Sequence, residues 1–198
     1  MSEEIRIIAE PKDTETCSFV VDRPVYEGGS AFFSSSERAA GSPLAEKLLA
    51  LDGVESVLVQ DNRVTVTAKG TGGEWLPLAK QVGATIRSIL QSGEQGISTT
   101  LLDSVPPADQ IRKKIEELFV REINPAIAAH GGYVELLDVK GNEVYLRLGG
   151  GCQGCGMADV TLKQGVERSI RTALPMVGAI MDTTDHASGR NPYYQPSK

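Results

Sequence analysis

The sequence has 198 residues, with an apolar content of 40% and few aromatic residues, which is enough for one large domain or two small ones. Its net charge of −6 and pI near 5 argue against nucleic acid as the main partner, because phosphate binding requires a basic face. No run is long and apolar enough to span a bilayer, and the first residues lack the basic and apolar segments of a leader, so we expect a cytoplasmic protein without membrane contact.

The first half predicts a domain, 1–92, of short strands and two amphipathic helices. Apolar runs and alternating apolar positions mark the strands. Ser42 followed by Pro43 marks the start of the first helix, as N-cap and first-turn proline. We expect strands at 5–9, 17–21, 30–34, 54–60 and 63–69, and helices at 42–51 and 74–91.

The periodic pattern lapses between the two halves. Residues 93–106 are rich in Gly, Ser and Thr, and Pro106-Pro107 interrupts any helix. We interpret 93–106 as a linker that lets the two halves move relative to each other.

The second half predicts a compact domain, 107–186, of α-β-β-α-β order. We expect a helix at 109–122, a short helix restarting at Asn124-Pro125, a hairpin of 133–139 and 143–148, a helix to about 174 and a strand at 177–181. The polar tail 187–198 is expected to be disordered. The fold class is therefore α/β (α+β), with two small two-layer domains.

A Cys-x-x-Cys pair is the main chemical feature of the chain. Cys152 and Cys155 lie in a glycine-rich run between the expected hairpin and helix, where orphan N–H groups stabilise thiolates. All-cysteine sites for zinc and iron–sulfur clusters usually need four ligands. The remaining cysteine, Cys17, lies far upstream in an apolar strand and is expected to be packed. Two subunits related by a two-fold axis could supply the missing pair.

Three kinds of site remain open for this pair. Five glycines between positions 149 and 156 leave room for a bulky inorganic core and favour an iron–sulfur cluster. A structural zinc site and a dithiol/disulfide couple are the alternatives, so the competing functions are a zinc-stapled interaction module and a thiol–disulfide oxidoreductase. His130, before Gly131, is interpreted as a helix C-terminal residue rather than a ligand.

These residues resemble a known family, the NifU-like, Nfu-type iron–sulfur scaffold and carrier proteins. The C-terminal half carries the family pattern in Asn124-Pro125, His130-Gly131-Gly132 and the run from Gly149 to Glu167. The first half is similar to the family's own N-terminal domain in Arg23-Pro24, Gly41-Ser42-Pro43, Gly53-Val54 and the hairpin 61–67 that leads to Trp75.

The resemblance implies a homodimer that binds one iron–sulfur cluster, [4Fe-4S] favoured over [2Fe-2S], through Cys152 and Cys155 of each subunit. It also implies partners, namely apo iron–sulfur client proteins that receive the cluster and upstream assembly factors. Nothing in the sequence matches a nucleophile–base pair, a phosphate loop or a paired-carboxylate site, so we expect no enzymatic turnover. Residues 1–92 carry 13 acidic and 9 basic side chains, and we expect this domain to recognise clients.

Overall fold

The chain folds into two compact units with separate cores. A computed structural model describes residues 4–98, 100, 105–129, 131–150 and 156–183. The units are Met1–Ser104 and Val105–Lys198. Each combines helices with a sheet, so the mixed α/β fold expected from the sequence is confirmed. The tail 187–198 lies outside the described residues.

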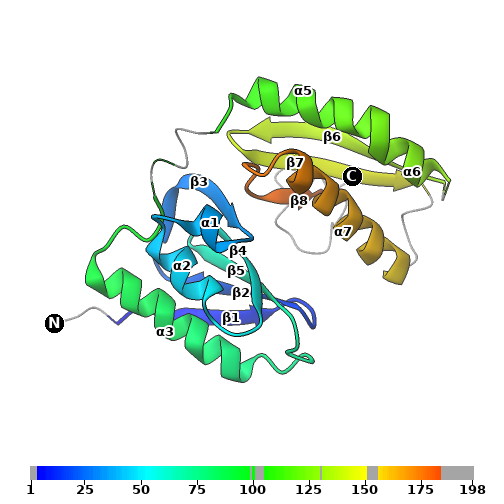
Figure 1. The fold of residues 1–198 in the computed structure, drawn as a ribbon. Helices are drawn as coiled ribbons and strands as arrows, with labels where there is room; N and C mark the ends of the chain where they lie inside the picture. The colour runs from blue at the N-terminus through cyan, green and yellow to red at the C-terminus, as the bar shows by residue number, and fades with distance from the viewer. Residues whose placement is uncertain (1–3, 99, 101–104, 130, 151–155, 184–198) are drawn as a thin grey trace, which may run out of the picture. The chain divides into compact units, whose positions relative to one another are not determined.

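The first unit is a five-stranded antiparallel sheet with the strand order β1-β2-β5-β4-β3, and its helices lie on one face (Figure 1). Its elements are β1 (Ile7–Pro11), β2 (Thr16–Val21), β3 (Tyr26–Phe33), α1 (Ser36–Ala39), α2 (Pro43–Leu49), β4 (Val54–Asp61), β5 (Arg63–Ala68) and α3 (Leu76–Ser92). Every expected element is present. The short α1 was not expected, although Ser35 provides a side-chain cap for the N–H of Arg38.

Two strands of this sheet have different limits from those expected. β1 starts at Ile7 rather than at position 5 and continues to Pro11, which pairs with Cys17. β3 starts at Tyr26 rather than at position 30, because the pairing shifts between Tyr26 and Ser30 and the strand continues through an irregularity. Gly29 has φ 99° at this irregularity. The sequence suggested that the strand begins after this glycine, but Gly29 is part of β3.

The core of the first unit lies between the sheet and its helices. Alternate strand residues face the helices and are at most 1% exposed: Cys17, Phe19, Val21, Val57, Val59, Val64 and Val66. The apolar stripe of α3, Val82, Ile86 and Ile89, packs against them. Full burial of each such side chain stabilises the fold by about 1.5–3 kcal/mol.

The start of the expected 93–106 linker belongs to the first unit. Ile97 is 1% exposed in its core, and the carbonyl of Gly96 accepts a 3.0 Å hydrogen bond from the N–H of Leu44. The Oγ of Ser42, expected to cap α2, instead accepts the N–H of Ser98 at 3.0 Å. A linker at 93–106 is therefore wrong for Gly96–Ser98, because an apolar side chain in a glycine-rich stretch still gains from burial.

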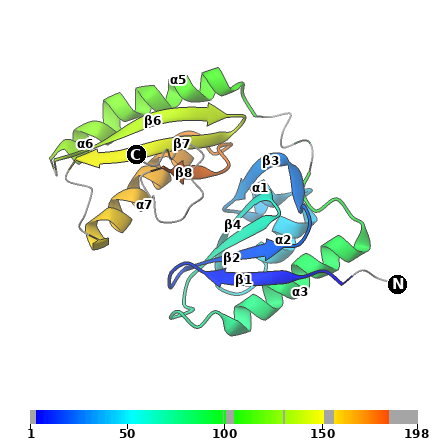
Figure 2. The same cartoon turned by 180° about the vertical axis from the view of Figure 1, so that it is seen from behind.

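The second unit packs its helices on one face of a three-stranded sheet in the order β6-β7-β8 (Figure 2). Its elements are α5 (Ala108–Leu118), a π-helical turn (Phe119–Ile123), α6 (Asn124–Ala128), β6 (Gly132–Lys140), β7 (Glu143–Gly150), α7 (Gly156–Ala173) and β8 (Ile180–Asp182). β6 and β7 form the expected antiparallel hairpin, and β8 is parallel to β7. The last strand is shorter than the expected 177–181 and lies later, since the pairing with β7 covers Ile180–Asp182; Val177 is fully buried in the core.

The π-helical turn corrects the expectation of a regular helix at 109–122. The N–H of Asn124 donates to the carbonyl of Phe119, five residues earlier, which widens the helix by one residue. A regular 3.6-residue period would have directed Glu122 inward, whereas the wider turn buries Ile123 at 5% exposure. Pro125 follows directly. Because it lacks a backbone N–H, it cannot donate the next hydrogen bond of the helix.

Candidate cysteine site at the end of the second sheet

The cysteine pair is bracketed by two described elements. β7 ends at Gly150 and α7 begins at Gly156. Cys152 and Cys155 lie between them, outside the described residues, and so does His130. The frame around the pair is therefore set by the last residues of β7, the first residues of β6 and the start of α7.

The first residues of β6 pair with the last residues of β7. Gly132 is opposite Gly150, and Tyr133 is opposite Gly149. Gly131, just before β6, has φ 73°, a left-handed conformation that favours glycine. The turn before β6 and the exit from β7 toward Cys152 thus lie at the same end of the sheet.

The side chain of Asn124 fixes β6 at this end. Its Oδ1 accepts the N–H of Val134 at 2.8 Å, and its Nδ2 donates to the carbonyl of Val134 at 3.1 Å. β6 is an edge strand, so the amide satisfies two backbone groups in the manner of a neighbouring strand. Asn124-Pro125 was singled out in the sequence as a helix start, and its bridging role was missed because the partner strand lies beyond the turn.

Asn124→Ala is expected to lower the free energy of unfolding of the second unit by about 1–3 kcal/mol, because the partly buried N–H and C=O of Val134 lose both partners. Urea unfolding of the metal-free protein, followed by circular dichroism, measures the change. Asn124→Asp keeps the acceptor and should lose less. A loss below about 0.5 kcal/mol for Asn124→Ala would contradict the bridge.

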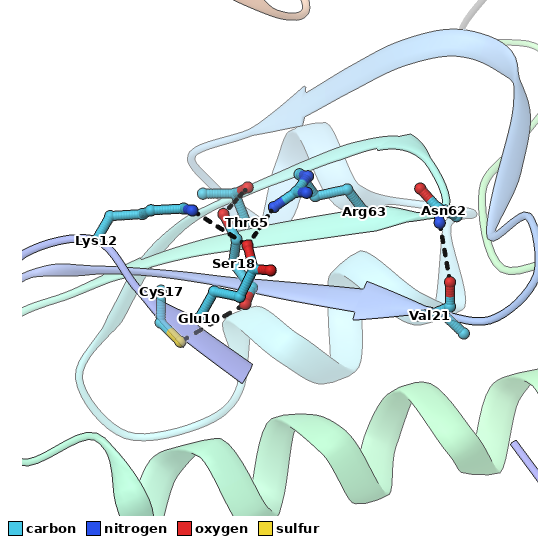
Figure 3. A network of polar contacts seen from close by, with 8 residues as sticks. All are labelled: Glu10, Lys12, Cys17, Ser18, Val21, Asn62, Arg63 and Thr65. Atoms are coloured by element: carbon cyan, nitrogen blue, oxygen red, sulfur yellow. Dashed lines mark hydrogen bonds and ion pairs between the residues drawn. The ribbon is translucent and has the colours of Figure 1, made fainter. Parts of the chain in front are cut away.

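Cys17 is confirmed as a packed residue of the first unit. Its side chain is fully buried, and its Sγ donates to the carbonyl of Ser18 at 3.8 Å (Figure 3). Burial raises the pKa of the Cys17 thiol, so its reactive thiolate form is disfavoured. Cys17 is therefore unsuited to bind metal from the folded state.

The opposite face of the same strands carries a small polar network. The carboxylate of Glu10 forms ion pairs with Arg63 at 3.0 Å and Lys12 at 3.1 Å, and Ser18 and Thr65 share a 3.0 Å hydrogen bond (Figure 3). The hydrogen bond from Arg63, followed by that from Lys12, lowers the pKa of Glu10 to about 2. One carboxylate neutralised by two cations forms a half-buried ion-pair group on the sheet.

The rest of the described chain offers no alternative metal centre. Within the described ranges, no group of three or more His, Cys, Asp or Glu side chains is arranged to hold a metal ion. Trp75 is 4% exposed in the core of the first unit and donates its Nε1–H to the carbonyl of Asp13 at 3.1 Å. The thiol pair Cys152 and Cys155, which lies outside the described residues, therefore stays a prediction from the sequence as the soft-metal donor set.

Both units match family models. Residues 5–93 match the scaffold protein Nfu/NifU N-terminal family, and residues 115–181 match the NifU-like domain, so the two matches cover well over half of the chain. The chain belongs to the NifU/Nfu family. The matched NifU-like range includes the Asn124 bridge, both strands of the hairpin and the cysteine pair.

Curated relatives of this NifU/Nfu chain are described as "Fe/S biogenesis protein NfuA". The protein of Stenotrophomonas maltophilia (strain K279a) is 49% identical over 87 residues, 43% of this chain and 44% of the relative. That of Pseudomonas aeruginosa (strain LESB58) is 48% identical over 85 residues, 42% and 44% of the two chains. The match spans less than half the length of these relatives. In the described part of the chain, no helix has the length and apolar character needed to cross a membrane.

Proposed function

We propose that this protein is an iron–sulfur cluster scaffold or carrier, which binds a cluster between two subunits through Cys152 and Cys155 and transfers it to apo-proteins. The observation that carries the proposal is the thiol inventory: burial of Cys17 leaves two thiols in each chain for soft-metal ligation. Family membership and relatives described as Fe/S biogenesis proteins support the choice of cluster over zinc.

The chemistry of the pair suits a shared cluster. Iron–sulfur clusters are commonly held by four thiolates, so two subunits with one pair each complete the set. α7 starts one residue after Cys155, and the positive end of a helix dipole favours the thiolate form. We favour [4Fe-4S] over [2Fe-2S] because it is the cluster that the family resemblance implies. The partners are apo iron–sulfur clients and upstream assembly factors in the reducing cytoplasm.

Anaerobic reconstitution with ferrous iron and sulfide tests the proposal against its alternatives. Broad visible charge-transfer bands with bound iron and sulfide are expected. Colourless protein with stoichiometric zinc would instead indicate a structural zinc site. A stable Cys152–Cys155 disulfide that exchanges with substrate thiols, without cluster uptake, would indicate an oxidoreductase.

The first unit serves in this proposal to recognise clients. Residues 1–92 carry a net charge of −4, which raises the encounter rate with basic client surfaces. A fragment that starts at Val105, where the second unit begins, should still bind a cluster but transfer it to the client more slowly than the full chain.

The transfer rates of fragment and full chain should converge as salt is raised, because screening weakens attraction between exposed charges. The measurement is cluster transfer to an apo-client at low and high ionic strength. Equal rates at low salt, or an advantage of the full chain that salt leaves unchanged, would contradict electrostatic recruitment.

A further inference from the structure

An aromatic side chain covers the strand end that leads to the cysteine pair. Tyr133 of β6 lies directly opposite Gly149 of β7. A methyl group added at Gly149 would overlap Cζ of Tyr133 and lie 2.5 Å from its Oη and 2.7 Å from its Cε1. The ring therefore lies across the backbone of β7, and the contact requires glycine at position 149.

This contact is not part of the core. The tyrosine side of the hairpin is the outer face, and Tyr133 is 47% exposed. The neighbouring inward residues, Val134 and Leu148, are 3% and 1% exposed and belong to the core of the second unit. Burial of apolar surface thus does not by itself account for an aromatic ring at this place.

The ring covers a strand end beyond the pairing of β7 with β8. β8 pairs with β7 at Val144–Leu146, whereas β6 pairs with β7 as far as Gly150. Glycine also loses more backbone freedom on ordering than any other residue. A cross-strand aromatic ring over a glycine compensates by covering its backbone.

The tyrosine itself is held in place. The next residue, Val134, has both backbone groups bonded to Asn124, which fixes the start of β6. Gly149 lies three residues before Cys152 along the chain.

We propose that Tyr133 is a positioning residue for the cysteine pair. Its ring packs over Gly149, fixes the path by which β7 leaves the sheet toward Cys152, and thereby slows release of the bound cluster. The inference rests on the proposed cluster-binding function and assigns a residue that controls how long the cluster is held. Replacing a residue that orients a metal ligand without touching the metal typically lowers metal affinity or activity by about 10–100-fold.

The test compares rates of cluster loss from anaerobically reconstituted full-length protein. An excess of a ferrous chelator removes the iron, and decay of the visible absorption gives the rate. Tyr133→Thr keeps a strand-favouring residue without the ring and should lose the cluster about 10-fold faster. Tyr133→Phe keeps the ring and should stay within about twofold of the unmodified rate. Gly149→Ala displaces the ring and should resemble Tyr133→Thr.

Glu135→Gln is the matched control, because Glu135 lies two residues along the same strand and face and pairs with Arg147 at 2.5 Å. It should leave the rate unchanged. Three outcomes would each overturn the inference while leaving cluster binding intact. Tyr133→Thr could lose the cluster at the rate of the unmodified protein, or Tyr133→Phe could lose it as fast as Tyr133→Thr. The third outcome is that Glu135→Gln accelerates cluster loss as much as Tyr133→Thr does. Failure of the unmodified protein to take up iron and sulfide would overturn the proposed function and this inference together.

Discussion

Cys152→Ser and Cys155→Ser are each expected to abolish stable cluster binding. Serine oxygen is a hard and poorly ionised ligand, so it does not replace a thiolate on iron. In a shared site, one substitution removes two of the four ligands, because both subunits carry it. Iron and sulfide per chain, measured after anaerobic reconstitution and gel filtration, should fall from full occupancy to background in both variants.

Cys17 provides the matched control for these variants. Cys17→Ser should retain the full cluster, because the residue is buried in the core of the other unit. It should lower the free energy of unfolding by about 1–3 kcal/mol, since a hydroxyl replaces a buried thiol. Cys17→Ala avoids the polar atom and serves where Cys17→Ser folds poorly. Retention of a full cluster in Cys155→Ser would contradict the shared thiolate site.

Cluster binding is also expected to drive dimerisation. The metal-free protein should be mainly monomeric at micromolar concentration, and the loaded protein should be a dimer, with an apparent dissociation constant lower by on the order of 100-fold or more. The reason is that ligand–metal bonds, and not buried protein surface, join the subunits. Anaerobic sedimentation velocity over a range of concentrations measures both states.

The cysteine variants separate ligation from surface contact in this experiment. Cys152→Ser should remain monomeric after the same iron and sulfide treatment. A metal-free dimer that persists at nanomolar concentration would show that protein surface holds the subunits together, and the cluster would then not be the link.

The alternation of apolar residues made most of the fold predictable. Val64 and Val66 in β5, or Ile111 and Ile115 in α5, occur at the spacing of their element, and the structure buries them as expected. Local patterns failed where a residue acts on a distant segment. Ile97 enters the core of the first unit from a glycine-rich stretch, and no local periodicity marks that contact.

The chemistry of the candidate site remains a prediction from the sequence. The spacing of Cys152 and Cys155 among glycines favours an iron–sulfur cluster, with a zinc site and a dithiol couple as the alternatives. The Asn124 bridge to Val134 could not be predicted because its partner strand lies beyond the turn, and the contact of Tyr133 with Gly149 could not be predicted because it depends on the β6–β7 register. The π-helical turn at Phe119–Ile123 was hidden as well, since the apolar spacing around it fits an ordinary helix until Glu122.

Native mass spectrometry of the anaerobically reconstituted protein tests the central claim most directly, because it counts chains, iron and sulfide in one particle. The proposed site predicts two chains with four iron and four sulfide atoms, and single chains without metal when the cluster is removed. A single chain that carries a whole cluster, or a chain that binds one zinc ion and no sulfide, would contradict a cluster shared between two subunits.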